Sequence, residues 1–135
     1  MKAKLAVLGA ALGFMAGALP MMAHHSFSAE YDTSKPVKMT GKFVRMEWIN
    51  PHSSLFFTVT DANGKEVEWR AETPPPNAML RNGVRPNMLH AGDIITLSGN
   101  LAKDGSNLMW CGSVTFPNGT VIGLQGVPGK DSPEK

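Results

Sequence analysis

The chain has 135 residues, which suits one domain, and carries 13 Lys and Arg against 11 Asp and Glu. Two of those lysines, Lys2 and Lys4, lie in a segment that we expect to be removed, so the mature chain has no net formal charge and no basic stripe. Nucleic acid is therefore not expected as a partner. The single cysteine, Cys111, excludes an intramolecular disulfide, and we expect its thiol to be buried.

Residues 1–23 have the features of a secretory signal peptide. Two lysines precede an uncharged stretch, residues 5–18, that is rich in Ala, Gly and Leu. This stretch is shorter than the roughly 20 residues that a bilayer-spanning helix needs, so we expect cleavage rather than a permanent anchor. The mature protein is then periplasmic or secreted and does not span the membrane.

Two cleavage positions fit the small residues near the end of this segment. Cleavage after Ala18 is one, and cleavage after Ala23 is the other, which would leave His24 as the first residue. Pro20 interrupts the apolar helix shortly before Ala23 and favours the later position.

A short polar arm, residues 24–35, follows the signal peptide. Phe27 and Tyr31 are its large apolar side chains, and we expect them to hold the arm against the body of the protein. A β-domain is expected over residues 36–125. Residues 126–135 are rich in Gly, Pro and charge and are expected to form a flexible tail.

The first expected strand begins at Pro36. Apolar and polar residues alternate along it, but the phase of the alternation changes after Phe43. A one-residue change of phase exchanges the two faces of a strand, so we expect a β-bulge near Phe43 and Val44. The strand ends at the corner Asn50-Pro51, because proline cannot donate a ladder hydrogen bond.

Further strands and one short helix follow, separated by Gly-, Pro- and Asn-containing turns. Asn77 is expected to cap a helix over residues 78–81. Leu108, Trp110, Gly112, Val114 and Phe116 are expected to share one face of the fifth strand, and Val59, Trp69, Leu97 and Trp110 to be buried. The later strands are expected at residues 55–60, 66–72, 94–101, 108–116 and 121–124.

This order of elements predicts an all-β fold. Three strands, a short helix and two or three further strands are typical of a small OB-like Greek-key barrel of five to six strands. A plain β-sandwich is the alternative.

Several short motifs resemble those of one protein family. They are His24-His25-Ser26-Phe27, Glu30-Tyr31-Asp32, Glu47-Trp48-Ile49-Asn50-Pro51-His52, Pro75-Pro76-Asn77 and Ala91-Gly92-Asp93. In them the chain resembles an uncharacterised family of small exported bacterial proteins, a domain of unknown function. The resemblance covers nearly all of the mature chain and implies no established activity. A small residue before His-His is the usual export junction in that family, which supports cleavage after Ala23.

The histidines are the residues best suited to chemistry in this sequence. If His24 is the first residue, its α-amine and its ring can chelate one ion, and a ring from His52 or His25 can complete a T-shaped set of three nitrogens. This histidine brace suits Cu(II), which favours planar nitrogen ligation, so copper is the expected cofactor. The alternative is that the terminal histidines are ordinary polar residues and that His52 only hydrogen-bonds its own corner. His90 is expected on a surface turn.

Other residue types give weaker indications. Carboxylates that alternate along strands usually form a solvated face, and no nucleophile elbow or phosphate loop is present in the sequence, so we do not predict an enzyme. The methionines are expected to fill gaps in the core. The carboxylates concerned are Glu47, Glu66, Glu68 and Glu72.

A second functional hypothesis requires no metal. Trp48, Pro75 and Asn77 could line a pocket near the Pro-rich loop for a small ligand or a peptide. The protein would then be an accessory domain that binds a ligand or an exported protein partner. A purely structural role in an exported complex is a third possibility.

Overall fold

The computed structural model of the protein describes residues 27–124. The expected signal peptide, His24, His25 and the expected tail lie outside these residues. The elements in chain order are α2 (Phe27–Glu30), β1 (Tyr31–Glu47), β2 (Ser53–Thr60), β3 (Glu66–Thr73), α3 (Pro76–Arg81), β4 (Ile94–Ala102), β5 (Leu108–Thr115) and β6 (Val121–Gly123).

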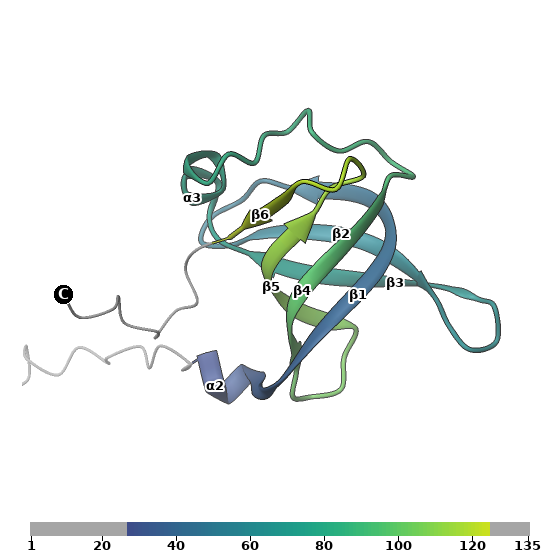
Figure 1. Ribbon diagram of the computed structural model, residues 1–135. Coiled ribbons are helices and arrows are strands. Elements are labelled where there is room, and N and C mark those ends of the chain that lie inside the picture. The colour runs from purple at the N-terminus through teal and green to yellow at the C-terminus, as the bar shows by residue number, and fades with distance from the viewer. Residues whose placement is uncertain (1–26, 125–135) are drawn as a thin grey trace, which may run out of the picture.

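Five strands form a closed barrel and the sixth extends it (Figure 1). The strand order is β3-β2-β1-β4-β5-β6, and a parallel pairing of β3 with β5 closes the ring. The other pairings are antiparallel. With α3 between β3 and β4, this is the arrangement expected of an OB-like Greek-key barrel, so the predicted fold is confirmed and the sandwich alternative does not apply.

The long, curved strand β1 serves both sides of the closure (Figure 1). Tyr31 to Lys42 pair with β4, and Lys42 to Glu47 pair with β2. The register with β2 shifts between Phe43 and Arg45, which confirms the predicted bulge. Because of this bulge, both halves of the strand direct apolar side chains toward the core. Those side chains are Val37, Met39, Phe43 and Met46, and Trp48 follows directly after the strand.

Some element ends differ from expectation. β1 begins at Tyr31 rather than Pro36, because Tyr31 already pairs with Ala102 of β4. Asn77 does not cap α3. Pro75 is the N-cap, with no side-chain hydrogen bond, and the next proline lies in the first turn, where its fixed φ suits a helix start.

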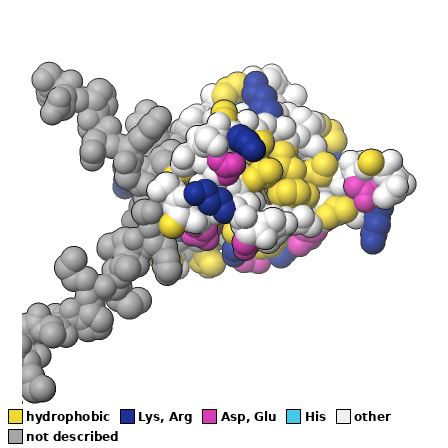
Figure 2. All heavy atoms as spheres, turned by 90° about the horizontal axis from the view of Figure 1, so that it is seen from below, with side chains coloured by type: hydrophobic (Ala, Val, Ile, Leu, Met, Phe, Trp, Pro, Cys, Tyr) yellow, Lys and Arg dark blue, Asp and Glu magenta, His cyan; other side chains and the backbone are white. Residues whose placement is uncertain are grey.

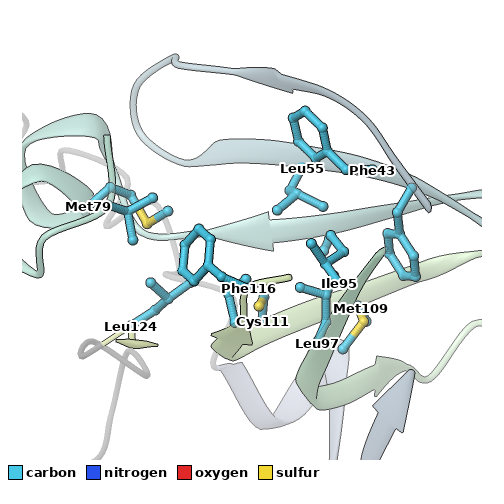
Figure 3. Packing of buried hydrophobic residues seen from close by; sticks show 13 residues of the cluster. Phe43, Leu55, Met79, Ile95, Leu97, Met109, Cys111, Phe116 and Leu124 are labelled. Atoms are coloured by element: carbon cyan, nitrogen blue, oxygen red, sulfur yellow. The ribbon is translucent and has the colours of Figure 1, made fainter. Parts of the chain in front are cut away.

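The interior of the barrel holds the main hydrophobic core. Met79 of α3 lies at one end and points toward Phe116 and Leu124 (Figure 3). The expected role of the methionines is confirmed for Met79 and Met109, which are fully buried in this core. The fully or largely buried members are Phe43, Leu55, Phe57, Ala71, Met79, Val84, Ile95, Leu97, Met109, Cys111, Val114, Phe116 and Leu124.

Trp110 is buried as expected, but it belongs to a second cluster. Met109 and Cys111 on either side of it face the main core, so Trp110 points to the opposite side of the sheet. Gly112 is an extra residue in β5, since Gly99 pairs with Cys111 while Ser98 pairs with Ser113. This second bulge changes the phase of the alternation. The residues that were expected to share one face therefore do not: they are Leu108, Trp110, Gly112, Val114 and Phe116. Of the other expected core residues, Leu97 is fully buried, whereas Val59 and Trp69 are only half-buried.

At this bulge the backbones of β4 and β5 approach closely. A Cβ added to Gly99 would lie 1.8 Å from the carbonyl oxygen of Trp110. Only glycine therefore fits at this position without a shift of the backbone.

The described surface has mixed polarity. Figure 2 shows acidic and basic side chains interspersed on the face seen there, with hydrophobic side chains between them. Neither helix in residues 27–124 has the length and apolarity needed to cross a bilayer.

Candidate functional site

Aromatic rings gather around Trp110 on the outer side of the barrel. The ring centroids of Phe27 and Tyr31 lie 5.5 and 6.1 Å from that of Trp110, and 5.1 Å from each other. The imidazole of His52 contacts the same indole edge-to-face, with centroids 5.2 Å apart and an angle of 77° between the planes. These separations are those of favourable aromatic pairs. We call Phe27, Tyr31, His52 and Trp110 the Trp110 cluster.

Hydrogen bonds to β4 and the turn after it hold the arm in place. The backbone N–H of Lys103 donates to the carbonyl of Glu30 (2.9 Å), and its Nζ donates to the carbonyl of Ser28 (2.6 Å). The amide of Asn100 donates to the carbonyl of Asp32 (2.8 Å). Together with the ring contacts, these bonds confirm that Phe27 and Tyr31 anchor the arm to the barrel.

His52 lies between the corner Asn50-Pro51, whose peptide bond is cis, and the start of β2. Its Nδ1 lies 3.3 Å from Oε1 of Glu72, and its side chain is 35% exposed. The other carboxylate oxygen of Glu72 accepts a hydrogen bond from the hydroxyl of Tyr31. The side chain of Glu72 is only 18% exposed. Tyr31, Glu72 and His52 thus form one hydrogen-bonded chain from the arm to the corner.

The environment of Tyr31 keeps its hydroxyl protonated. Burial of the ring raises the pKa of Tyr31 well above its usual range, and the hydrogen bond to Glu72 and the negative charge of that residue raise it further. The phenol is therefore a neutral donor at any pH at which the protein would work.

Two buried polar atoms have no hydrogen-bond partner within residues 27–124. They are Oγ of Ser53, the next residue along the chain, and Nε1 of Trp110, whose ring contacts the imidazole. An unpaired buried donor destabilises a fold by about 1–3 kcal/mol. Of the two groups only the indole belongs to the surroundings of His52, because Ser53 shares its strand face with Leu55 and Phe57 of the main core.

The structure describes two of the four histidines. His24 and His25 lie outside the described residues, although the chain reaches the Trp110 cluster at Phe27, two residues after His25. His90 has a 78% exposed side chain whose Nδ1 lies 3.8 Å from Asp93, which confirms its expected surface position. Among the described residues no group of three or more His, Cys, Asp or Glu side chains could hold a metal ion.

The residues of the expected ligand pocket lie just after β1 and at the start of α3. Trp48 packs against the main core, Pro75 is the N-cap of α3, and Asn77 is exposed in the first turn of that helix. Two shallow clefts in the described part of the chain are lined by other residues. One lies over β1, β4 and β5 near Gly99 and Gly112, and the other lies beside Met88 and Phe116.

Sequence reasoning missed the partners of His52. Glu72 was expected on a solvated face with Glu66 and Glu68, and this is correct for those two, which pair with Lys42 and Arg45 at the surface. It is wrong for Glu72, which is bonded to Tyr31 and His52. The lone tyrosine, in an arm that must attach to the barrel, was the available signal for a specific polar contact.

Fold and site together define a small OB-like barrel with a histidine–carboxylate pair on its outer wall. The chain belongs to DUF6152, a family of unknown function whose model matches residues 12–109. The matched part contains His52 and Glu72 and ends one residue before Trp110. No curated protein matches the chain.

Proposed function

We propose that the protein is an exported metal-binding module, that copper is its preferred ion, and that His24, His25 and His52 are the ligands. The observation that carries the proposal is that Phe27 and His52 contact the same indole, that of Trp110. His24 is three residues before Phe27 in the chain, and an extended residue spans about 3.3 Å, so it can reach roughly 10 Å from this anchor. That reach covers the surroundings of His52.

The chemistry of these groups favours copper. After cleavage behind Ala23, the α-amine and ring of His24 offer two nitrogens, and the partly exposed ring of His52 offers a third. Nitrogen donors in a planar set suit Cu(II), which also has the highest affinity in the divalent series. The α-amine has a pKa near 8, so its deprotonation by the metal costs about 1 kcal/mol at neutral pH. The amine is therefore a feasible ligand.

The module would store, deliver or present the ion in the periplasm or outside the cell. It would hold the ion on the outer wall of the barrel, because the interior is filled by the main core. We propose no catalytic step.

The test is a titration of correctly processed protein, beginning at His24, with Cu(II). Calorimetry should show one equivalent, and electron paramagnetic resonance should show nitrogen hyperfine structure. His52→Ala should weaken binding, and one additional residue before His24 should abolish the amine contribution. His90→Ala is the matched control, since that exposed histidine lies outside the Trp110 cluster and its removal should leave binding unchanged.

Three results would contradict the proposal. Unchanged affinity and spectrum with an additional N-terminal residue would show that the amine is not a ligand. Unchanged binding in His52→Ala would show that the arm binds copper without the barrel. No uptake by the processed protein would refute the metal function and favour an accessory domain that binds a ligand or a protein partner without metal.

A further inference from the structure

We propose that Glu72 is a positioning residue, which fixes the tautomer and orientation of His52 so that Nε2 is the atom available to a metal. The part of this inference that concerns metal rests on the proposed function. The part that concerns the imidazole stands on the contacts of Glu72 with Tyr31 and His52.

The contact with Glu72 determines which nitrogen of the neutral His52 ring carries the hydrogen. Nδ1 of His52 lies 3.3 Å from Oε1 of Glu72, and the second oxygen of the carboxylate already accepts the hydroxyl proton of Tyr31. A carboxylate has only acceptors, and a neutral imidazole has one donor and one acceptor nitrogen. Nδ1 must therefore carry the hydrogen, which leaves the lone pair on Nε2.

Glu72 is itself held in place by neighbouring strands. It lies on β3 at the parallel pairing that closes the barrel, directly opposite Trp110 on β5 and Ser54 on β2. The hydroxyl of Tyr31 fixes its far oxygen, and the ring of Tyr31 packs against both Phe27 and the indole. The carboxylate is thus supported by three strands rather than by a mobile loop.

Two contacts orient the imidazole ring of His52. The edge-to-face contact with Trp110 restricts the plane of the His52 imidazole, and the bond to Glu72 restricts its rotation within that plane. Metal-binding histidines commonly donate their other N–H to a carboxylate, and loss of that partner typically reduces metal affinity 10- to 100-fold. Glu72 has the position and chemistry of such a partner.

The test of orientation needs no metal and no substitution. Long-range ¹H–¹⁵N nuclear magnetic resonance of the metal-free protein at mildly alkaline pH distinguishes the two neutral tautomers by their nitrogen shifts. We expect the Nδ1–H form for His52. A wild-type protein with mainly the Nε2–H form would overturn the proposal, whatever the protein does with copper.

Substitutions then distinguish a role of Glu72 in orienting His52 from a role in the stability of the fold alone. Glu72→Ala removes the acceptor, so His52 should revert toward the Nε2–H form that free imidazole side chains prefer, and Cu(II) affinity should fall about 10- to 100-fold. Glu72→Gln keeps the shape of the side chain but offers one acceptor oxygen to two donors, Tyr31 and His52, so the share of the Nδ1–H form should lie between those of wild type and Glu72→Ala. Glu68→Ala removes a carboxylate from the same strand and face, and it should change neither quantity.

The outcomes distinguish this inference from the proposed function. Copper binding that is equally tight in wild type and in folded Glu72→Ala would overturn the positioning role. If the wild type binds no copper, the proposed function fails, and the tautomer spectra still decide whether Glu72 orients His52. If Glu72→Ala does not fold, the wild-type spectrum decides the same question, and an Nδ1–H share in Glu72→Gln that equals the wild-type share would contradict the role of the second acceptor oxygen.

Discussion

Truncation of Trp110 should be the most damaging single change at the candidate site. The indole is 1% exposed and is in contact with the rings of Phe27, Tyr31 and His52. Removal of a buried tryptophan side chain usually costs about 3–5 kcal/mol. About 1 kcal/mol of this loss is offset, because Trp110→Ala also removes a buried N–H without a partner in the described residues, and burial of such a group costs at least that much. We therefore expect a loss of about 2–4 kcal/mol.

Urea unfolding followed by far-ultraviolet circular dichroism is the suitable assay, because the substitution itself removes one of the tryptophans that give the fluorescence signal. Trp110→Phe keeps a ring against its neighbours and removes the unpaired donor, so its loss should be about 1 kcal/mol. Trp69→Ala is the matched control at a half-buried tryptophan and should cost less than Trp110→Ala. A loss below about 1 kcal/mol for Trp110→Ala would refute the burial of this ring beneath the arm.

Three further predictions concern the ionisation of two groups and one close backbone contact. Tyr31 is the single tyrosine, and its pKa is raised, so the folded protein should show no tyrosinate absorbance near pH 10. Because the unfolded chain alone loses this proton there, stability should fall as pH rises above about 10, and normal titration of the folded protein would contradict this. Burial raises the pKa of Cys111 to about 12, so its thiol should resist alkylation at mildly alkaline pH until urea unfolds the protein, whereas fast native labelling would show exposure. Gly99→Ala would place a Cβ against the carbonyl of Trp110 and should lower the free energy of unfolding by about 1–3 kcal/mol, while Gly112→Ala should be nearly neutral; equal effects would argue against the close approach.

The barrel could be predicted because its determinants are local. Alternation along each strand, the change of phase after Phe43 and the turn glycines are all visible within a few residues of sequence. Gly64 and Gly83 do adopt positive φ, as expected of residues that end a hairpin turn and a helix. The face of Trp110 was predicted wrongly because a second bulge at Gly112 interrupts the alternation of β5. A lone glycine in a strand can mark a bulge, but it can equally mark a bend or the close approach of another backbone, so the sequence alone does not identify the bulge.

The candidate site could be predicted only in part, because its contacts join distant segments. His52 stands out by residue type and by its corner, but Glu72 is 20 residues later and Tyr31 is 41 residues before Glu72. Glu66, Glu68 and Glu72 alternate on the same strand, and sequence pattern alone treats them alike. The barrel closure distinguishes them, because Glu72 pairs opposite Trp110 while the other two lie beyond the region where β3 pairs with β5.

The separation of the two hydrophobic clusters has a consequence for protein engineering. None of the residues of the Trp110 cluster belongs to the main core, and the wall of the barrel lies between them. Positions such as Phe27, His52 and Glu72 could therefore be randomised together in a library while the interior sequence stays constant. Variants with new ligand sets or new affinities could then be selected from a scaffold whose folding depends mainly on other residues.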